Sequence, residues 1–340
     1  MQATVKAVLF GVVAFMVAAC KPSATLETFG GPTMGSTYSV KFVHTAATPS
    51  TAVLKQGIDA ILADVDQQMS TWRADSRVST FNQAPAGTCM SVPAPMLELV
   101  ALGESLSKQT DGAFDMTLFP LMRAWGFGPG SRGEKVPSAE EIAAAKQGIG
   151  HQYLHIRDGQ LCKDIALKVD FNAVAAGQAV DRMAAFMESQ GIQHYVVEAT
   201  GEVKARGHKP DGSAWHIAIE APRDDQQIAQ KILNLDGLGL STSGDYRNYF
   251  EKDGRRYSHT LDARTGYPIA HTLASVTVAH PQAVYADGLS TLLMILGPEE
   301  GMTFATQSGI AAFFIVREGG GFVTKASPAF LAQFPDTVAR

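Results

Sequence analysis

Apolar positions along the chain recur with helical or strand periods, and these periods predict its elements. Between residues 51 and 69 apolar side chains return every three or four positions, which is typical of an amphipathic helix with one buried face. Strict alternation over residues 37–43 predicts a strand. Further helices are predicted over residues 94–110, 174–190 and 283–296.

The second half of the chain is rich in short apolar runs bounded by turn residues. The strongest hairpin signal is Asp253-Gly254, a two-residue turn between two such runs. Hairpins mixed with helical crossovers favour an α+β fold over a doubly wound parallel sheet. Strands are predicted over residues 166–171, 194–198, 202–206, 246–252, 255–261, 272–279, 310–316 and 321–325.

The first residues have the pattern of an export signal. The apolar run from Ala7 to Ala19 is shorter than the roughly 20 residues that span a bilayer, so residues 1–19 are predicted to be a signal peptide. The stretch that ends Val-Ala-Ala-Cys20 resembles a bacterial lipobox, which implies a lipid-anchored mature protein facing the periplasm. Lys21 resembles the outer-membrane sorting pattern. An ordinary signal peptide is the alternative, and residues 20–32 are predicted to be a tether before a single domain over 33–340.

Composition narrows the class of protein. Among 340 residues, 46% are apolar and 18% charged, which indicates a globular chain. The 28 Lys and Arg against 33 Asp and Glu give no basic field, so nucleic acid is not an expected partner. Besides Cys20 the chain has Cys89 and Cys162, and an exported compartment permits a disulfide between them. The sequence leaves the bonded and the free state equally open.

Three motifs match known patterns but lack their context. Gly128 to Gly133 fits G-x-G-x-x-G, yet no strand precedes it and no helix follows, so a loop is predicted. Ser105 and Lys108 fit S-x-x-K without the companion motifs of the penicillin-recognising enzymes. His151 and His155 are four residues apart, but the glycines before them argue against a helix, and both are predicted to be surface residues.

Four other stretches combine polar and small residues beside apolar elements. One is a turn at residues 111–117. In another, Asp170 ends an apolar run just before the small residues 173–177, a junction that exposes amides and carbonyls to an anion or a cation, although tight packing alone also explains it. His259 near a hairpin tip is placed for a general base, with a structural role as the alternative. Asp287 and Thr291 lie one helical turn apart and are a hard-oxygen pair suited to Mg²⁺, or a solvated polar stripe.

The order of these motifs resembles the ApbE family of FAD:protein FMN transferases from residue 33 to about 309. The resemblance implies a T-fold-like, two-lobed α+β structure with antiparallel or mixed sheets and flanking helices. It also implies Mg²⁺-dependent transfer of FMN from FAD to a Thr or Ser hydroxyl of a target flavoprotein, with release of AMP. The motifs are Gly-Pro-Thr-Met-Gly-Ser-Thr-Tyr at 31–38, Met-Ser-Thr-Trp-Arg-Ala-Asp-Ser-Arg-Val-Ser-Thr-Phe-Asn at 69–82, Ser-Gly-Asp-Tyr-Arg at 243–247 and Ser-His-Thr-Leu-Asp-Ala-Arg-Thr-Gly at 258–266.

The resemblance assigns roles to individual residues. It makes His259 the base and Asp287, Thr291, Ser290 and the carbonyl of Ala173 the metal ligands. Ala176 and Ala263 depart from the usual Lys or Glu and the usual Pro of the family. The implied contacts to flavin and nucleotide are Met34, Trp72, Ala113, Phe114, Asp115, Asp170, Ala176 and Leu261, with the Trp72 indole stacking on the isoalloxazine.

The acceptor implied by the family is an exported flavoprotein subunit, of a sodium-pumping quinone reductase or of an Rnf-type complex. Two other functions stay open. One is a Mg²⁺-dependent FAD pyrophosphatase that releases FMN and AMP to water, and the other is a flavin-binding lipoprotein without turnover.

Overall fold

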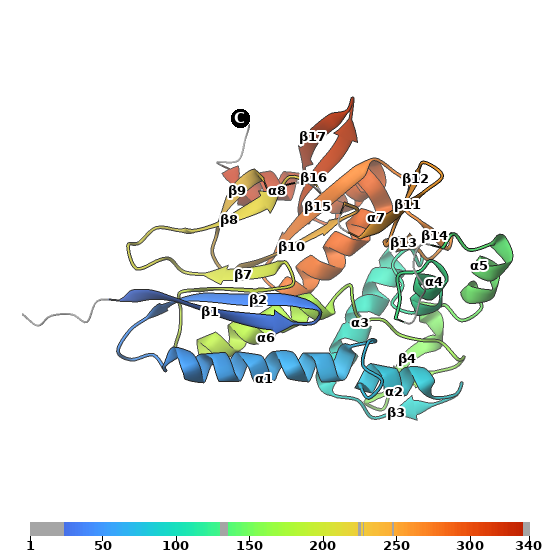
Figure 1. Cartoon of the computed structure of the whole chain (residues 1–340), viewed down its shortest axis with the longest axis horizontal. Coiled ribbons are helices and arrows are strands. Elements are labelled where there is room, and N and C mark those ends of the chain that lie inside the picture. The colour runs from blue at the N-terminus through green and yellow to red at the C-terminus, as the bar shows by residue number, and fades with distance from the viewer. Residues whose placement is uncertain (1–23, 130–134, 224–225, 227, 247, 336–340) are drawn as a thin grey trace, which may run out of the picture.

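The computed structural model describes residues 24–129, 135–223, 226, 228–246 and 248–335 (Figure 1). The predicted signal peptide and Cys20 lie outside these residues, as does part of the predicted loop at 128–133. Within the described part, none of the helices combines the length and the apolar character that crossing a bilayer requires.

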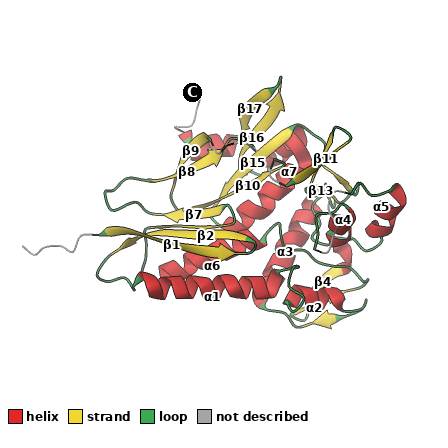
Figure 2. Cartoon of the chain, in the orientation of Figure 1, coloured by secondary structure: helices red, strands yellow, loops and turns green. Residues whose placement is uncertain are grey.

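The centre of the fold is one eight-stranded sheet in which every neighbouring pair is antiparallel (Figure 2). This sheet and the helices that flank it confirm the predicted α+β class. In spatial order the strands are β1 (Thr25–Thr33), β2 (Ser36–His44), β6 (Tyr195–Ala199), β7 (Glu202–Arg206), β10 (Leu238–Gly244), β15 (Leu273–His280), β16 (Ala311–Glu318) and β17 (Gly321–Ala326).

Helices cover one face of this sheet and bury the main apolar core between them and the strands (Figure 1). The helix α7 consists of two helical segments that meet at a kink at Gly297, whose backbone is not helical, so the first segment ends at the predicted residue 296. On the other face a second core includes Trp215, Phe313 and Phe330. The helices are α1 (Thr51–Met69), α2 (Arg77–Gln83), α3 (Ala94–Gln109), α4 (Phe119–Ala124), α5 (Ala139–Lys146), α6 (Ala175–Ser189), α7 (Ala283–Gln307) and α8 (Pro328–Gln333), with a short 3₁₀ turn η1 (His151–Tyr153).

Smaller antiparallel sheets surround the main one. The predicted hairpin at Asp253-Gly254 is confirmed as β11 (Tyr249–Lys252) and β12 (Arg255–Ser258). The others are β3 (Cys89–Met90) with β5 (Gln160–Lys163) and β4 (Leu154–Arg157), β8 (Trp215–Glu220) with β9 (Ala229–Leu235), and β13 (Leu261–Asp262) with β14 (Tyr267–Pro268).

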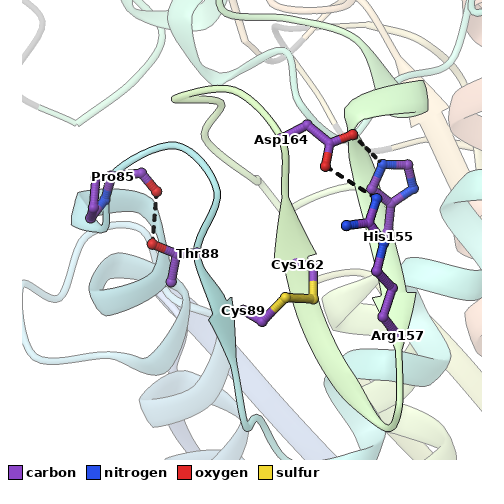
Figure 3. The surroundings of a disulfide bond; sticks show 7 residues. All are labelled: Pro85, Thr88, Cys89, His155, Arg157, Cys162 and Asp164. Atoms are coloured by element: carbon purple, nitrogen blue, oxygen red, sulfur yellow. Dashed lines mark hydrogen bonds and ion pairs between the residues drawn. A yellow bond between two sulfur atoms is a disulfide. The ribbon is translucent and has the colours of Figure 1, made fainter.

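Cys89 and Cys162 form a disulfide that joins β3 to β5, with their Cα atoms 4.0 Å apart (Figure 3). The question that the sequence left open is thereby answered. Beside the bond, His155 Nε2 lies 2.6 Å from Asp164 Oδ2. His151 Nδ1 lies 3.1 Å from Glu104 Oε2. Each histidine is therefore paired with a carboxylate, in keeping with the rejection of a two-histidine metal site.

The predicted tether at residues 20–32 is wrong from Thr25 onward, because these residues form most of β1. Gly30, Gly31 and Pro32 obscured the strand in the sequence. At Gly30 a Cβ would lie 2.5 Å from the carbonyl oxygen of Tyr38 on β2, so the pairing itself requires glycine there.

The predicted strand at residues 166–171 is also wrong. Its cross-strand pairing in the described structure is an isolated bridge between Lys168 and Leu118. The segment nevertheless carries an apolar face, since Val169 and Phe171 are fully buried. Burial of alternate residues thus produced a strand-like pattern without a neighbouring strand.

Candidate active site

A cavity of about 720 Å³ brings together segments that are distant in the sequence. Its wall is built from the start of β2, the loop after α3, the segment before α6, the β6–β7 turn, β8, the end of β10, the segment from β12 to β13, and α7. Of the residues singled out in the sequence, those that line it are Phe114, Asp115, Asp170, Ala173, His259, Leu261, Asp287 and Thr291.

The remaining sequence-predicted site residues do not line this cavity: Met34, Trp72, Ala113, Ala176 and Ser290. Trp72 lies in the loop after α1 with 70% of its surface exposed, and its stacking on a flavin ring stays a prediction. Met34 sits in the β1–β2 turn next to the lining residues Ser36 and Thr37. Ala113 and Ala176 are buried behind the cavity wall.

Asp287 lies on α7 and faces α6. Its Oδ2 accepts a 2.8 Å hydrogen bond from the backbone amide of Gly177. A Cβ on Gly177 would lie 2.5 Å from the carbonyl oxygen of Ala283, so glycine is what lets the two helices approach this closely. Burial, reinforced by the nearby carboxylate of Glu202, raises the pKa of Asp287 well above its ordinary value.

Hydroxyl groups connect Asp287 and Thr291 with β10. Ser243 Oγ lies 3.3 Å from Thr291 Oγ1 and 2.9 Å from Ser290 Oγ. Ser290 Oγ also donates to the carbonyl oxygen of Asp287 at 3.0 Å. Ser290 is fully buried among these partners and does not line the cavity, whereas the other predicted metal ligands, Asp287, Thr291 and Ala173, do.

Asp170 and Asp115 lie on neighbouring segments of the wall. The amide of Asp170 donates to the carbonyl of Met116 at 2.8 Å, and burial raises the pKa of Asp170 to about 6. Asp115 Oδ1 accepts hydrogen bonds from the amide and the hydroxyl of Thr117 in the same loop. Its Oδ2 accepts a hydrogen bond from the amide of His151. Asp115 therefore shapes the loop, and burial raises its pKa as well.

His259 follows β12 and lines the cavity. Its Nδ1 lies 2.9 Å from the carbonyl oxygen of Asn248. Since a carbonyl only accepts, this contact selects the tautomer with the proton on Nδ1 and leaves Nε2 as an acceptor. Burial lowers the pKa of His259 below its ordinary value, so the neutral ring is favoured. A neutral imidazole with a free Nε2 can take a proton from a bound hydroxyl.

Sequence reasoning missed the acidic residues of the β6–β7 region. Glu198 and Glu202 flank the Thr200-Gly201 turn, and Glu220 on β8 joins them in the wall. Glu202 Oε2 accepts from the Thr200 hydroxyl at 2.8 Å, and burial raises the pKa of Glu202. No motif marks these residues; the only sequence signal is that acids bracket a turn between two buried strands.

The donor set of Asp287, Thr291 and the Ala173 carbonyl fits a hard cation, because it combines carboxylate, hydroxyl and carbonyl oxygens. Among the residues that the structure describes, no group of three or more His, Cys, Asp or Glu side chains is arranged to hold a metal. A cation here would therefore take its remaining ligands from a substrate or from water.

Comparison with known proteins places this geometry in a family. The sequence model of the ApbE family matches residues 34–314. The chain belongs to the ApbE family. Among its relatives, the FAD:protein FMN transferase of Vibrio cholerae is 42% identical over 316 residues, covering 93% of this chain and 95% of that protein. The FAD:protein FMN transferase of Haemophilus influenzae is 37% identical, with coverage of 97% and 98%.

Solved structures of ApbE proteins share the fold. The apo form of the flavinyl transferase ApbE from Pseudomonas stutzeri has a TM-score of 0.86 and 56% identity, covering 92% of this chain and 97% of that one. The flavin transferase ApbE from Vibrio cholerae has a TM-score of 0.85 and 40% identity, covering 92% and 99%. The family and the α+β fold implied by the sequence motifs are both confirmed.

Proposed function

We propose that the protein is a transferase that moves FMN from FAD to a Thr or Ser hydroxyl of a target flavoprotein and releases AMP in a Mg²⁺-dependent reaction. The observation that carries the proposal is that His259, which follows β12, lines the same cavity as Asp287 and Thr291 on α7. The names of the relatives, FAD:protein FMN transferases, support the same chemistry.

Asp287, Thr291 and the carbonyl of Ala173 would hold the metal. When bound there, Mg²⁺ supplies the positive charge that a diphosphate requires and stabilises the departing AMP phosphate. The other lining residues support a bound cation, because the ionised carboxylate of Glu198 or Glu202 would repel a diphosphate. The raised pKa of Asp287 also supports a bound cation, because the protein alone provides no compensating charge for the ionised carboxylate.

His259 would act as the base. The target hydroxyl gives its proton to His259 Nε2 as its oxygen attacks the FMN phosphorus, and the bond from that phosphorus to the AMP oxygen breaks. The contact with the Asn248 carbonyl holds the ring in the tautomer that this step requires. Base catalysis of this kind supplies about 10²- to 10⁴-fold in rate.

The cavity suits a flavin dinucleotide in size and lining. Its volume of about 720 Å³ lies within the range of small-molecule sites. Phe114 and Leu261 provide apolar surface for an aromatic ring system, and Asp170 provides an acceptor or, when protonated, a donor. These features support FAD as the substrate.

The expected setting is the periplasmic face of a bacterial membrane. Cys20 would carry the lipid, with the outer membrane favoured by Lys21. The acceptor would be an exported flavoprotein subunit of the quinone reductase or Rnf type. The disulfide between Cys89 and Cys162 supports an oxidising compartment.

One experiment tests the function. The chain without residues 1–20 is incubated with FAD, Mg²⁺ and a candidate acceptor subunit, and covalent flavin is detected by in-gel fluorescence. We expect a fluorescent acceptor band that requires Mg²⁺, together with AMP in the supernatant. Release of FMN and AMP without a labelled band in any candidate acceptor would indicate a pyrophosphatase, and retention of intact FAD a flavin-binding protein.

A further inference from the structure

The segment that leads to Asp170 and Ala173 enters the cavity without belonging to a strand. Residues 167–171 belong to no strand, and their backbone pairing in the described structure includes the isolated bridge between Lys168 and Leu118. The backbone of Val169 is instead paired with a side chain. Its amide donates to Asn82 Oδ1 at 2.7 Å, and Asn82 Nδ2 donates to its carbonyl at 2.8 Å.

A carboxamide is suited to this pairing because it reproduces the donor and acceptor of a peptide group. Asn82 therefore provides for Val169 what the adjacent strand of a sheet would provide. Aspartate has the same shape but offers only acceptors when ionised, so it would repel the Val169 carbonyl. Because Val169 is fully buried, its backbone groups have no ready access to water if the amide is lost.

Asn82 is itself held firmly. It lies in the last turn of α2, a helix whose N-cap Ser76 accepts from the amide of Ser79 at 3.1 Å and donates to the carbonyl of Ser70 at 2.7 Å. At the other end of the helix, the buried Lys163 Nζ donates to the carbonyls of Phe81 at 2.8 Å and Leu167 at 3.2 Å. The side chains of Lys163 and Asn82 thus tie the same segment to the end of α2.

The paired residue directly precedes the cavity wall. Asp170 follows Val169 and is also held by its own amide bond to the Met116 carbonyl, and Ala173 lies three residues after Asp170, so the Val169 backbone leads directly into both positions. We propose that Asn82 is a positioning residue, which fixes Asp170 and the carbonyl of Ala173 for FAD and its metal through Val169. The proposal rests on the proposed function and adds a residue that does not itself line the cavity.

The test compares Asn82→Ala, Asn82→Asp and Gln83→Ala. Gln83 is exposed on the same helix and serves as the matched control. Amide hydrogen exchange is measured on the ligand-free proteins, and FAD affinity by flavin fluorescence with Mg²⁺ and no acceptor. We expect Asn82→Ala to speed exchange of the Val169 amide at least about tenfold, and both Asn82 variants to weaken FAD binding by about 10- to 100-fold. Gln83→Ala should stay within about twofold of the wild type in both measurements.

The Asn82→Asp variant keeps the test decisive if Asn82→Ala folds poorly, because it preserves the side-chain volume and the bond to the Val169 amide. Circular dichroism establishes that each variant is folded. Unchanged exchange at Val169 in Asn82→Ala, or FAD affinity within twofold of the wild type in the folded variants, would overturn the proposal. Wild-type protein that binds FAD but does not label an acceptor would contradict the proposed function alone, since the Asn82 comparison needs no acceptor.

Discussion

The backbone amide of Gly177 on α6 donates a 2.8 Å hydrogen bond to Asp287 Oδ2 on α7. One carboxylate oxygen of the proposed metal ligand is thereby fixed before any ligand arrives, while Asp287 still lines the cavity. Orientation by such an outer partner generally preserves the geometry of a metal ligand. Two predictions follow from this contact, one for each residue.

The variant Asp287→Asn distinguishes an effect on metal binding from an effect on folding. Asparagine can still accept from the Gly177 amide but carries no charge, so Mg²⁺ affinity should fall at least about 100-fold and FMN transfer should be lost. Because the raised pKa makes the charged carboxylate costly at pH 7 without metal, metal-free Asp287→Asn should be at least as stable as the metal-free wild type.

Thermal unfolding with and without Mg²⁺ measures both effects. The wild type should gain melting temperature on adding Mg²⁺ and lose it on adding EDTA, whereas Asp287→Asn should respond to neither. A variant that retained the Mg²⁺-dependent shift would exclude Asp287 as a ligand. Asp287→Ala should likewise abolish FAD cleavage and transfer.

Replacing Gly177 by Ala should force α6 and α7 apart. The new Cβ would lie 2.5 Å from the Ala283 oxygen and 2.7 Å from Val284 Cα, and both are backbone atoms that cannot rotate away. We expect a loss of about 1–3 kcal/mol in the free energy of unfolding, despite the better helix propensity of alanine, together with weaker Mg²⁺ binding. Ala185→Ser, exposed on the same helix, is the control and should stay within about 0.5 kcal/mol. If denaturant titration showed that Gly177→Ala and Ala185→Ser are equally stable, the close approach of α6 and α7 at Gly177 would be contradicted.

The acid limb of the pH profile should report His259. Burial lowers its pKa, so the neutral base persists as the pH falls, and at saturating Mg²⁺ the midpoint of the decline in transfer should lie below the ordinary histidine pKa of about 6.5. His259→Ala should bind FAD normally but transfer FMN about 10²- to 10⁴-fold more slowly. The measurement is kcat/KM against pH for both proteins. Transfer by His259→Ala at the wild-type rate would remove His259 from the mechanism.

Removing the disulfide should destabilise the protein without altering the cavity chemistry. Cys89 and Cys162 are separated by 73 residues, and a crosslink over a loop of that length stabilises by about 2–4 kcal/mol. The double variant Cys89→Ser, Cys162→Ser should show this loss in denaturant titration. Reductant should produce the same loss in the wild type and no change in the double variant. Equal stability of oxidised and reduced wild type would contradict the prediction.

The periodic spacing of apolar residues in the sequence revealed the elements that bury only one of their faces. The helix α1 begins and ends at the predicted residues 51 and 69, because its apolar stripe packs against α6 and the sheet. The spacing of Asp287 and Thr291 likewise identified one wall of the cavity, since residues four apart share a helix face. Features that arise from a single helix face are local, and local patterns are visible in a sequence.

Other features depend on partners that the sequence does not name. The strand β1 contains Gly30 because the facing Tyr38 carbonyl leaves no room for a side chain, and that requirement is invisible without the pairing. The false strand at 166–171 reflects real burial at Val169, whose backbone partner is a side chain 87 residues away. Glu202 reaches the cavity through the sheet order and not through any motif.

The β1–β2 hairpin determines where the proposed lipid anchor would join the fold. Its turn adjoins Ser36 and Thr37 in the cavity wall, while its free end is Thr25, the first residue of a nine-residue strand. At about 3.4 Å per residue, the strand spans roughly 27 Å. The lipid proposed on Cys20 would therefore join the chain near the end of the hairpin opposite the turn beside the cavity, about one strand length away from that turn.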